Sequence, residues 1–340
     1  ITVESEHSAM SACLGASAAG ARVMTATSSN GLALMWEMLY IASSMRQPVL
    51  LTLVNRAISA PINIHCDHGD SMGARDSGWI QLYAENNQEA YDNMLMAPVI
   101  AEHMDVRLPL MVCLDGFIIS HAIETMQIEE DDKVRAFIGE HTPYCSLLDT
   151  EKSPTWGALG LNTYYIEYKK AQQVAMENAK TVIQDVSKQF GELFGRHYEL
   201  FESYRLADAE RVIVAINSVA GEIKEVVDEL RDKGEKVGLL KIRVFRPFPY
   251  AEIAEALAQA KIITVLDRSA SMGAYGPLFT EIRTALYDAP SHPMIYNRTF
   301  GLGGRELFME DIKAIFQESE RYLQAGKIET VFDYLCVRGG

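Results

Sequence analysis

Short apolar runs alternate with helical segments in the first 115 residues, and this alternation restricts the possible fold more than any other feature. We predict strands over residues 23–27, 48–54 and 109–114, and helices over 8–21, 32–45 and 88–103. Polar residues bound the run at 48–54, as is typical of a parallel strand buried on both faces. Alternating strands and helices predict an α/β fold, with helices covering a mostly parallel sheet.

The same alternation returns on a smaller scale in the second half of the chain. We predict strands over 211–216, 236–244 and 262–267, and helices over 221–233 and 250–260. Turn-forming residues and a helical stretch over 164–194 separate the two halves. The predicted units are a domain over 1–127, a connecting region over 128–207, a smaller α/β domain over 208–325 and a tail over 326–340. Residues 1–3 are predicted as the end of a strand, so we expect an N-terminal segment to precede Ile1.

Composition and charge exclude several classes of protein. The 340 residues are 48% hydrophobic and 23% charged, which is ordinary for a globular protein. A net charge of -15 repels phosphate backbones and anionic lipid, so we expect no nucleic-acid or membrane partner. The five cysteines form no C-x-x-C pair, which argues against an iron–sulfur cluster or structural zinc built by this chain alone. Isolated cysteines favour a reducing compartment, and we expect a cytoplasmic protein.

Polar residues follow the predicted strands of the first domain. They are Glu6, residues 28–31, Asn55 with Arg56, and Asp115 with Gly116. Ligands of open α/β sheets bind at the carboxyl ends of the strands, so we expect these residues to cluster at one edge.

The glutamate and arginine side chains near this edge raise the question of what each one binds. Glu4 and Glu6 precede a helix rich in small residues at 15–20, and a buried carboxylate there needs a partner. Arg56 presents a fixed fork of donors that matches a carboxylate. It could bind an anionic substrate or form an ordinary ion pair, and the pattern leaves both alternatives open.

The segment His-Cys-Asp-His-Gly-Asp at 65–70 superficially resembles a metal site. Alternate side chains point in different directions in an extended loop, so we favour a hydrogen-bonded loop that shapes a pocket, and we assign no metal ligand. We favour structural roles for His7 and His121. The glycine-rich turn at 301–304 lacks the spacing of a dinucleotide site.

Several motifs, in this order, resemble one known family. They lie at 4–9, 15–21, 25–32, 55–57, 63–70, 76–79, 114–117, 245–249 and 301–305. Together they are similar to the α subunits of pyruvate:ferredoxin oxidoreductases (pyruvate synthases), within the multi-subunit 2-oxoacid:ferredoxin oxidoreductases.

The resemblance implies a pyrimidine-type thiamine-diphosphate-binding domain followed by a domain like the transketolase C-terminal domain. It implies oxidative decarboxylation of pyruvate to acetyl-CoA, or the reverse, with coenzyme A and ferredoxin. In a gap-free alignment with this family, Glu6 and not Glu4 corresponds to the catalytic glutamate. Arg56 corresponds to the arginine that binds the substrate carboxylate. Ser28 and Asn30 would line the cofactor. A β subunit would complete the thiamine diphosphate site and hold Mg²⁺, while a ferredoxin-like subunit and a γ subunit complete the complex. Other subunits would hold the [4Fe-4S] clusters.

One part of the family pattern is absent here. A Tyr-Pro-Ile-Thr-Pro-like motif, whose threonine contacts substrate, precedes the point where this sequence begins. Relatives act on 2-oxoisovalerate, 2-oxoglutarate or oxalate, and the neutral Ser59 near Arg56 favours pyruvate over a dicarboxylate. A non-catalytic assembly subunit is the alternative from another class, and it would tolerate replacement of Glu6 and Arg56.

Overall fold

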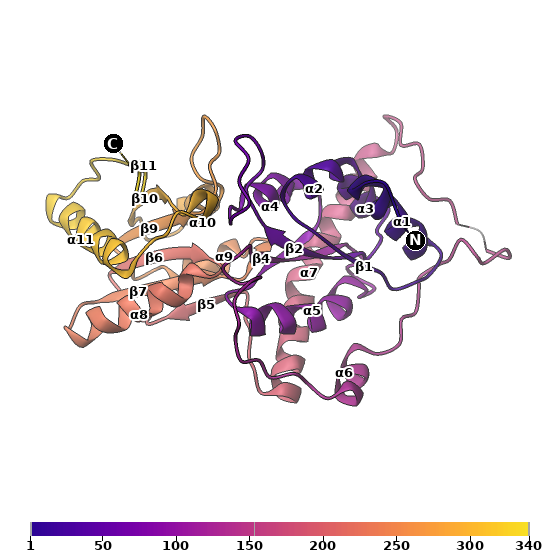
Figure 1. The fold of residues 1–340 in the computed structure, drawn as a ribbon, viewed down its shortest axis with the longest axis horizontal. Helices are drawn as coiled ribbons and strands as arrows, with labels where there is room; N and C mark the ends of the chain where they lie inside the picture. Colours follow the sequence, from indigo (N-terminus) through magenta and orange to yellow (C-terminus); the bar gives the residue numbers. More distant parts are fainter. Residues whose placement is uncertain (1, 153, 339–340) are drawn as a thin grey trace.

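The chain forms two lobes, each built around a largely parallel sheet (Figure 1). The computed structural model describes residues 2–152 and 154–338. The indigo-to-purple lobe holds the N-terminal half, and the orange-to-yellow lobe holds the C-terminal half (Figure 1). The predicted α/β fold, built on mostly parallel sheets, is confirmed.

The first sheet has the strand order β1-β2-β4-β3-β8. Its strands are β1 (Met24–Thr27), β2 (Leu50–Asn55), β3 (Ile80–Tyr83), β4 (Leu110–Asp115) and β8 (Val244–Arg246). The first four are parallel, whereas β8 runs antiparallel to β3. Every residue of β4 is buried, as expected of a central strand covered on both faces. The register pairs Asn55 with Asp115, so β2 and β4 end at the same level.

Helices cover both faces of this sheet. They are α1 (Glu6–Ala18), α2 (Ser29–Leu34), α3 (Trp36–Ser44), α4 (Gly69–Gly73), the 3₁₀ turn η1 (Ala74–Asp76), α5 (Asn87–Ala101), α6 (Asp131–Ile138) and α7 (Tyr165–Phe194). Residues of α1 and α3 share one apolar core with β2, while α5 and α7 enclose the core on the opposite face.

The second sheet has the order β11-β10-β9-β6-β7-β5, with only β5 antiparallel to its neighbour. Its strands are β5 (Phe201–Tyr204), β6 (Arg211–Ile216), β7 (Val237–Ile242), β9 (Ile262–Asp267), β10 (Met294–Thr299) and β11 (Phe332–Tyr334). The helical segments are α8 (Val219–Asp232), α9 (Tyr250–Ala256), α10 (Pro277–Tyr287), η2 (Leu302–Gly304) and α11 (Met309–Ala325).

Two strands cross the predicted domain limits, which remain predictions. β5 lies in the predicted connecting region but pairs with β7. The single strand predicted over 236–244 is instead β7, followed by β8, which joins the first sheet. An apolar run indicates a buried strand, but it does not indicate which sheet the strand joins.

Other local predictions need correction. Thr2 and Val3 belong to no strand, and Ile1 lies outside the described residues. The helix predicted over 32–45 is two helices, α2 and α3, separated at Met35. Residues 69–76, for which no helix was predicted, form α4 and η1. No helix in the described part of the chain combines the length and hydropathy needed to cross a bilayer.

Candidate active site

Glu6 lies beside the segment that follows β1. A β-carbon added at Gly31 would stand 3.1 Å from Oε1 of Glu6, 3.0 Å from its Cγ and 2.4 Å from Oγ1 of Thr27. Gly31 therefore leaves the space that the Glu6 side chain needs. The prediction that Glu6 and residues 28–31 share one edge of the sheet matches this geometry.

Local structure at the start of α1 fixes the backbone of Glu6. Ser5 is the N-cap residue, and its hydroxyl accepts a hydrogen bond from the backbone N–H of Ser8 at 3.3 Å. Glu6 is in the first helical turn, where a carboxylate is favoured by the helix dipole. Within the described residues, its carboxylate forms no hydrogen bond or ion pair, and it is exposed. The buried position expected from the sequence is therefore wrong for the single chain, because no residue of the described part covers the Glu6 side chain.

Arg56 directly follows β2, at the same edge. Its backbone N–H donates to Oδ2 of Asp70 at 3.0 Å. The side chain is half-buried, and its Nε is buried without a hydrogen-bond partner. Among the described residues no carboxylate pairs with Arg56, so the ordinary ion pair left open by the sequence does not form in this chain. A buried guanidinium nitrogen without a partner is a plausible binding group for an anion.

Asp70 joins the segments that carry these two residues. Its carboxylate accepts hydrogen bonds from the backbone N–H groups of Ser29, Arg56 and Ser71 and from the amide of Asn55, at 2.7–3.1 Å. Burial raises the pKa of Asp70 to about 6, although the four donors favour its ionised form.

Ser28 and Asn30 border the same edge. Oδ1 of Asn30 accepts hydrogen bonds from the backbone N–H of Ser59 and from the hydroxyl of Ser29, both at 3.1 Å. Ser29 has a φ of 49°, a conformation that serine rarely adopts. The loop after β1 is thus tied to the loop after β2, and Asn30 remains exposed.

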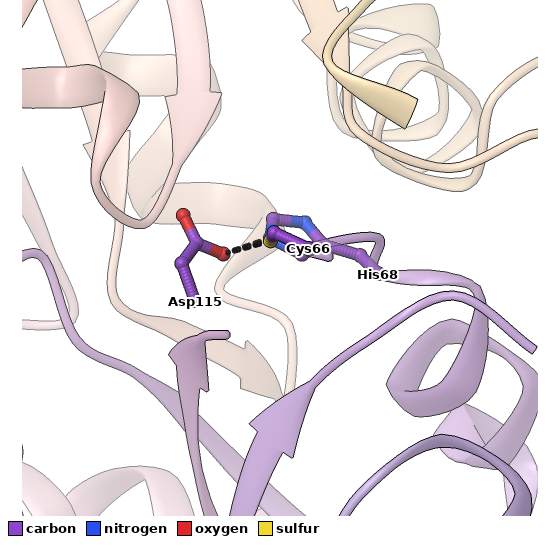
Figure 2. Close-up of side chains that lie close together, drawn as sticks. All are labelled: Cys66, His68 and Asp115. Atoms are coloured by element: carbon purple, nitrogen blue, oxygen red, sulfur yellow. Dashed lines mark hydrogen bonds and ion pairs between the residues drawn. The ribbon is translucent and has the colours of Figure 1, made fainter. Parts of the chain in front are cut away.

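A second cluster lies where the two lobes meet. Cys66, His68 and Asp115 place one ligand atom each within 4.8 Å of one another (Figure 2). Oδ1 of Asp115 lies 2.6 Å from Nε2 of His68 and accepts a hydrogen bond from the Cys66 thiol at 3.0 Å. The second lobe adds Arg268, whose Nη1 donates to Oδ2 of Asp115 at 2.8 Å, and Asn217, which donates to Oδ1 at 3.0 Å.

The charges in this cluster favour hydrogen bonding over metal binding. Burial opposes ionisation of Asp115, but Arg268 and His68 outweigh it and hold the pKa of Asp115 well below its usual range. The guanidinium of Arg268 already pairs with the carboxylate of Asp115, which a divalent cation would need as a ligand. The rest of the 65–70 segment points elsewhere, since Asp67 caps Gly69 at 2.7 Å and His65 packs against Phe117. We interpret the cluster as a junction between the lobes.

Four residues that organise these clusters were not predicted individually: Asp70, which was considered only as part of the 65–70 segment, and Asn217, Ser218 and Arg268. A usable signal was present for three of them. Asn217 and Ser218 follow β6 and Arg268 follows β9, so the rule that singled out Arg56 also applies to the second sheet. Asp70 gave no such signal, because it lies inside a loop-like segment far from any predicted strand end.

Comparison with known proteins agrees with the class that this fold and strand edge define, the thiamine-diphosphate-binding oxidoreductases. The family described as pyruvate flavodoxin/ferredoxin oxidoreductase, thiamine diphosphate-binding, matches residues 1–188. The family described as pyruvate:ferredoxin oxidoreductase core domain II matches residues 209–312. The chain belongs to the pyruvate:ferredoxin oxidoreductase family.

Individual relatives cover most of the chain. Pyruvate synthase subunit PorA of Thermotoga maritima is 55% identical over 94% of this chain and 81% of the relative. PorA of Methanocaldococcus jannaschii is 50% identical over 94% and 82%. Ketoisovalerate oxidoreductase subunit VorA of Pyrococcus abyssi is 46% identical over 97% and 83%.

Two solved structures show the likeness of the fold alone. A 2-oxoglutarate:ferredoxin oxidoreductase from Magnetococcus marinus has a TM-score of 0.66 at 21% identity, over 94% of this chain and 57% of that one. A split-gene transketolase has a TM-score of 0.54 at 11% identity, over 93% and 81%.

Proposed function

We propose that the chain is the α subunit of a pyruvate synthase. As one subunit of a hetero-oligomer, it catalyses the coenzyme A-dependent oxidative decarboxylation of pyruvate to acetyl-CoA and CO₂ with reduction of ferredoxin, or the reverse synthesis. PorA relatives at 50–55% identity over 94% of the chain support this function. The observation that carries it is a carboxylate, Glu6, and a guanidinium, Arg56, that flank one strand edge without partners in the described chain.

The residues at this edge fit the pyrimidine half of thiamine diphosphate. Gly31 leaves open the space beside Glu6 that any side chain would fill, and Ser28 and Asn30 border it. When bound, thiamine diphosphate supplies a carbon nucleophile at C2 of its thiazolium ring. The carboxyl group of Glu6 would hold a proton at N1′ of the aminopyrimidine, which favours the tautomer needed to remove the C2 proton.

Arg56 would bind the carboxylate of the 2-oxoacid. Its guanidinium presents parallel N–H donors that match the two oxygens of a carboxylate. Its buried Nε gains a partner on binding, and half-burial strengthens the interaction relative to water. Binding of the carboxylate at Arg56 would orient the carbonyl of the substrate, so Arg56 would supply positioning as well as affinity.

Other subunits would complete the site. Because Glu6 is exposed in this chain, a β subunit is the expected cover, and it would bring the diphosphate and Mg²⁺ half of the cofactor site. The [4Fe-4S] clusters would lie in a ferredoxin-like subunit and its neighbours, alongside a γ subunit. All five cysteines are free, in keeping with the expected cytoplasmic location.

The VorA relative keeps the choice of substrate open to a direct test. An extra methylene changes specificity by only about 1–3 kcal/mol in an apolar pocket, so 46% identity to a ketoisovalerate enzyme is compatible with either acid. Parallel assays of the assembled complex on pyruvate, 2-oxoisovalerate, 2-oxoglutarate and oxalate decide it. We expect the highest kcat/KM for pyruvate.

The experiment that tests the mechanism replaces Glu6 with glutamine in the assembled complex. Loss of the proton-holding carboxyl should lower kcat by about 10²–10⁴-fold. Glu4→Gln is the matched control, because Glu4 is an exposed carboxylate two residues away and should leave kcat unchanged. Wild-type turnover by an intact Glu6→Gln complex would overturn the mechanism and favour a non-catalytic assembly subunit.

A further inference from the structure

We propose that Asp70 is a positioning residue for the 2-oxoacid reaction, because its one carboxylate fixes the cofactor-side loop relative to the substrate-binding arginine. The inference rests on the roles proposed above for Glu6 and Arg56. Asp70 would contact neither cofactor nor substrate, but it would govern the distance between Glu6 and Arg56, which would contact them.

One oxygen of Asp70 connects the two segments. Oδ2 accepts the backbone N–H of Ser29 at 3.1 Å and the backbone N–H of Arg56 at 3.0 Å. Ser29 begins α2, the helix that contains Gly31 and therefore borders Glu6. Arg56 is the first residue after β2. Movement of Asp70 would consequently displace both sides of the site together.

The other oxygen holds Asp70 itself in place. Oδ1 accepts the side-chain amide of Asn55 at 2.8 Å and the backbone N–H of Ser71 at 2.7 Å. The amide of Asn55 also donates to the hydroxyl of Ser71 at 2.8 Å, and this hydroxyl accepts a hydrogen bond from Tyr83. Asp70 is only 1% exposed, so water cannot replace any of these donors at low cost.

This arrangement requires a carboxylate rather than an amide. All four neighbours donate hydrogen, and an ionised aspartate is an acceptor at both oxygens. In an Asp70→Asn chain, the NH₂ group must face either the Ser29 and Arg56 pair or the Asn55 and Ser71 pair. Either orientation sets the NH₂ group against two N–H donors. Facing Ser29 and Arg56, it pushes the loops after β1 and β2 apart; facing Asn55 and Ser71, it displaces the side chain of residue 70 that both loops contact.

A second buried aspartate provides a matched control. Asp267 is 2% exposed and accepts the backbone N–H groups of Leu278 and Phe279 and the amide of Asn297. These partners all lie in the second lobe, whereas those of Asp70 carry the proposed site. Asp267→Asn should therefore weaken the fold in the same way without moving Arg56 relative to Glu6.

The test uses the assembled complex and separates the two sides of the site. The KM for the 2-oxoacid reports on Arg56, and hydrogen–deuterium exchange at C2 of bound thiamine diphosphate, measured without substrate, reports on Glu6. Since a misplacement of about 1 Å can cost about 10²-fold, we expect Asp70→Asn to raise KM and to slow C2 exchange by about 10–100-fold each. Asp267→Asn should keep both within about twofold.

A milder variant covers the case in which Asp70→Asn does not assemble. Asn55→Ala removes one donor from Oδ1 and leaves the Oδ2 contacts, so it should shift both readouts in the same direction by a smaller factor. If Asp70→Asn and Asn55→Ala leave both readouts at wild-type values, or if Asp267→Asn moves them equally, the positioning role is overturned.

Arg56→Gln distinguishes this failure from failure of the proposed function. If Arg56→Gln raises KM while the Asp70 and Asn55 variants do not, only the positioning role fails. If Arg56→Gln itself leaves KM unchanged, the assignment of Arg56 fails and the positioning role fails with it.

Discussion

Replacing Asp115 with asparagine should loosen the junction between the two lobes. Asp115 ends β4 in the first lobe, is fully buried, and accepts hydrogen bonds from Cys66 in its own lobe and from Asn217, Ser218 and Arg268 in the other. His68 lies 2.6 Å away on the same oxygen. The change removes the only carboxylate that pairs with Arg268 among the described residues.

The expected magnitude follows from the burial of Arg268. This side chain is 6% exposed, so loss of its partner leaves a buried charge uncompensated. Breaking a buried ion pair in this way costs about 3–5 kcal/mol. At 1.36 kcal/mol for each factor of ten, the population with the junction open should rise by about 10²–10⁴-fold.

Hydrogen exchange of backbone amides measures this opening locally. The N–H of His68 donates to the backbone carbonyl of Arg268 at 2.8 Å, so its protection reports on contact between the lobes without involving Asp115 directly. Asp92→Asn is the control, since Asp92 is equally buried and pairs with Arg196 within the first lobe. It should increase exchange near Arg196 and leave the amide of His68 protected.

A double-mutant cycle completes the test. Asp115→Asn combined with Arg268→Met should destabilise the junction by less than the sum of the single changes, because the second change removes the uncompensated charge. Unchanged protection at His68 in Asp115→Asn, or additive effects within about 0.5 kcal/mol, would refute the reasoning.

Two further predictions concern the strand edge and the buried carboxylates. Gly31→Ala should slow C2 exchange by about tenfold or more, because its methyl group would stand 3.1 Å from Oε1 of Glu6 and 2.4 Å from Oγ1 of Thr27; Gly15→Ala, with nothing within 4 Å, should leave exchange unchanged. For pH, burial raises the pKa of Asp267 to about 6, above its unfolded value near 3.8. The folded chain then binds the extra proton, so this group's contribution to stability is complete below pH 4 and is lost as pH rises to about 6, by on the order of 2–3 kcal/mol. Denaturation of wild type and Asp267→Asn at pH 4.5 and 7 should show the smaller decline in the variant, and equal declines would contradict the assignment.

The sequence predicted well the strands that a local apolar pattern marks, and it missed strands such as β3, whose place depends on contacts between distant segments. β6 and β9 begin and end at the predicted residues, because each is a largely apolar run in which every residue is buried. β3 was missed because it is four residues long and contains Gln81. That glutamine is fully buried, and its amide donates to the backbone carbonyl of Ser71, a contact between distant segments that no local pattern reveals.

The same distinction applies to the candidate site. Glu6 and Arg56 could be selected because each follows a predicted strand, although only the strand before Arg56 forms, and a family resemblance supplied their roles. The 65–70 segment looked like one unit, yet the backbone divides it: Cys66 and His68 face the second lobe, while Asp70 turns back to the edge of the first sheet. Which way each side chain points depends on α4 and on the second lobe, so spacing along the chain could not resolve it.

Under the proposed role of Glu6, its exposure in the described chain implies that chemistry at this edge depends on assembly. Ser5 and Gly31 fix where the carboxylate lies, but exposure leaves it in a medium where charges interact weakly. Two unit charges 4 Å apart interact by about 1 kcal/mol in water and by about 4 kcal/mol near a protein surface at an effective dielectric constant of 20. A covering subunit would therefore strengthen every contact that Glu6 makes without moving it. In the proposed assembly, this chain would supply the geometry of the carboxylate, and the covering subunit would supply the low dielectric that makes the geometry effective.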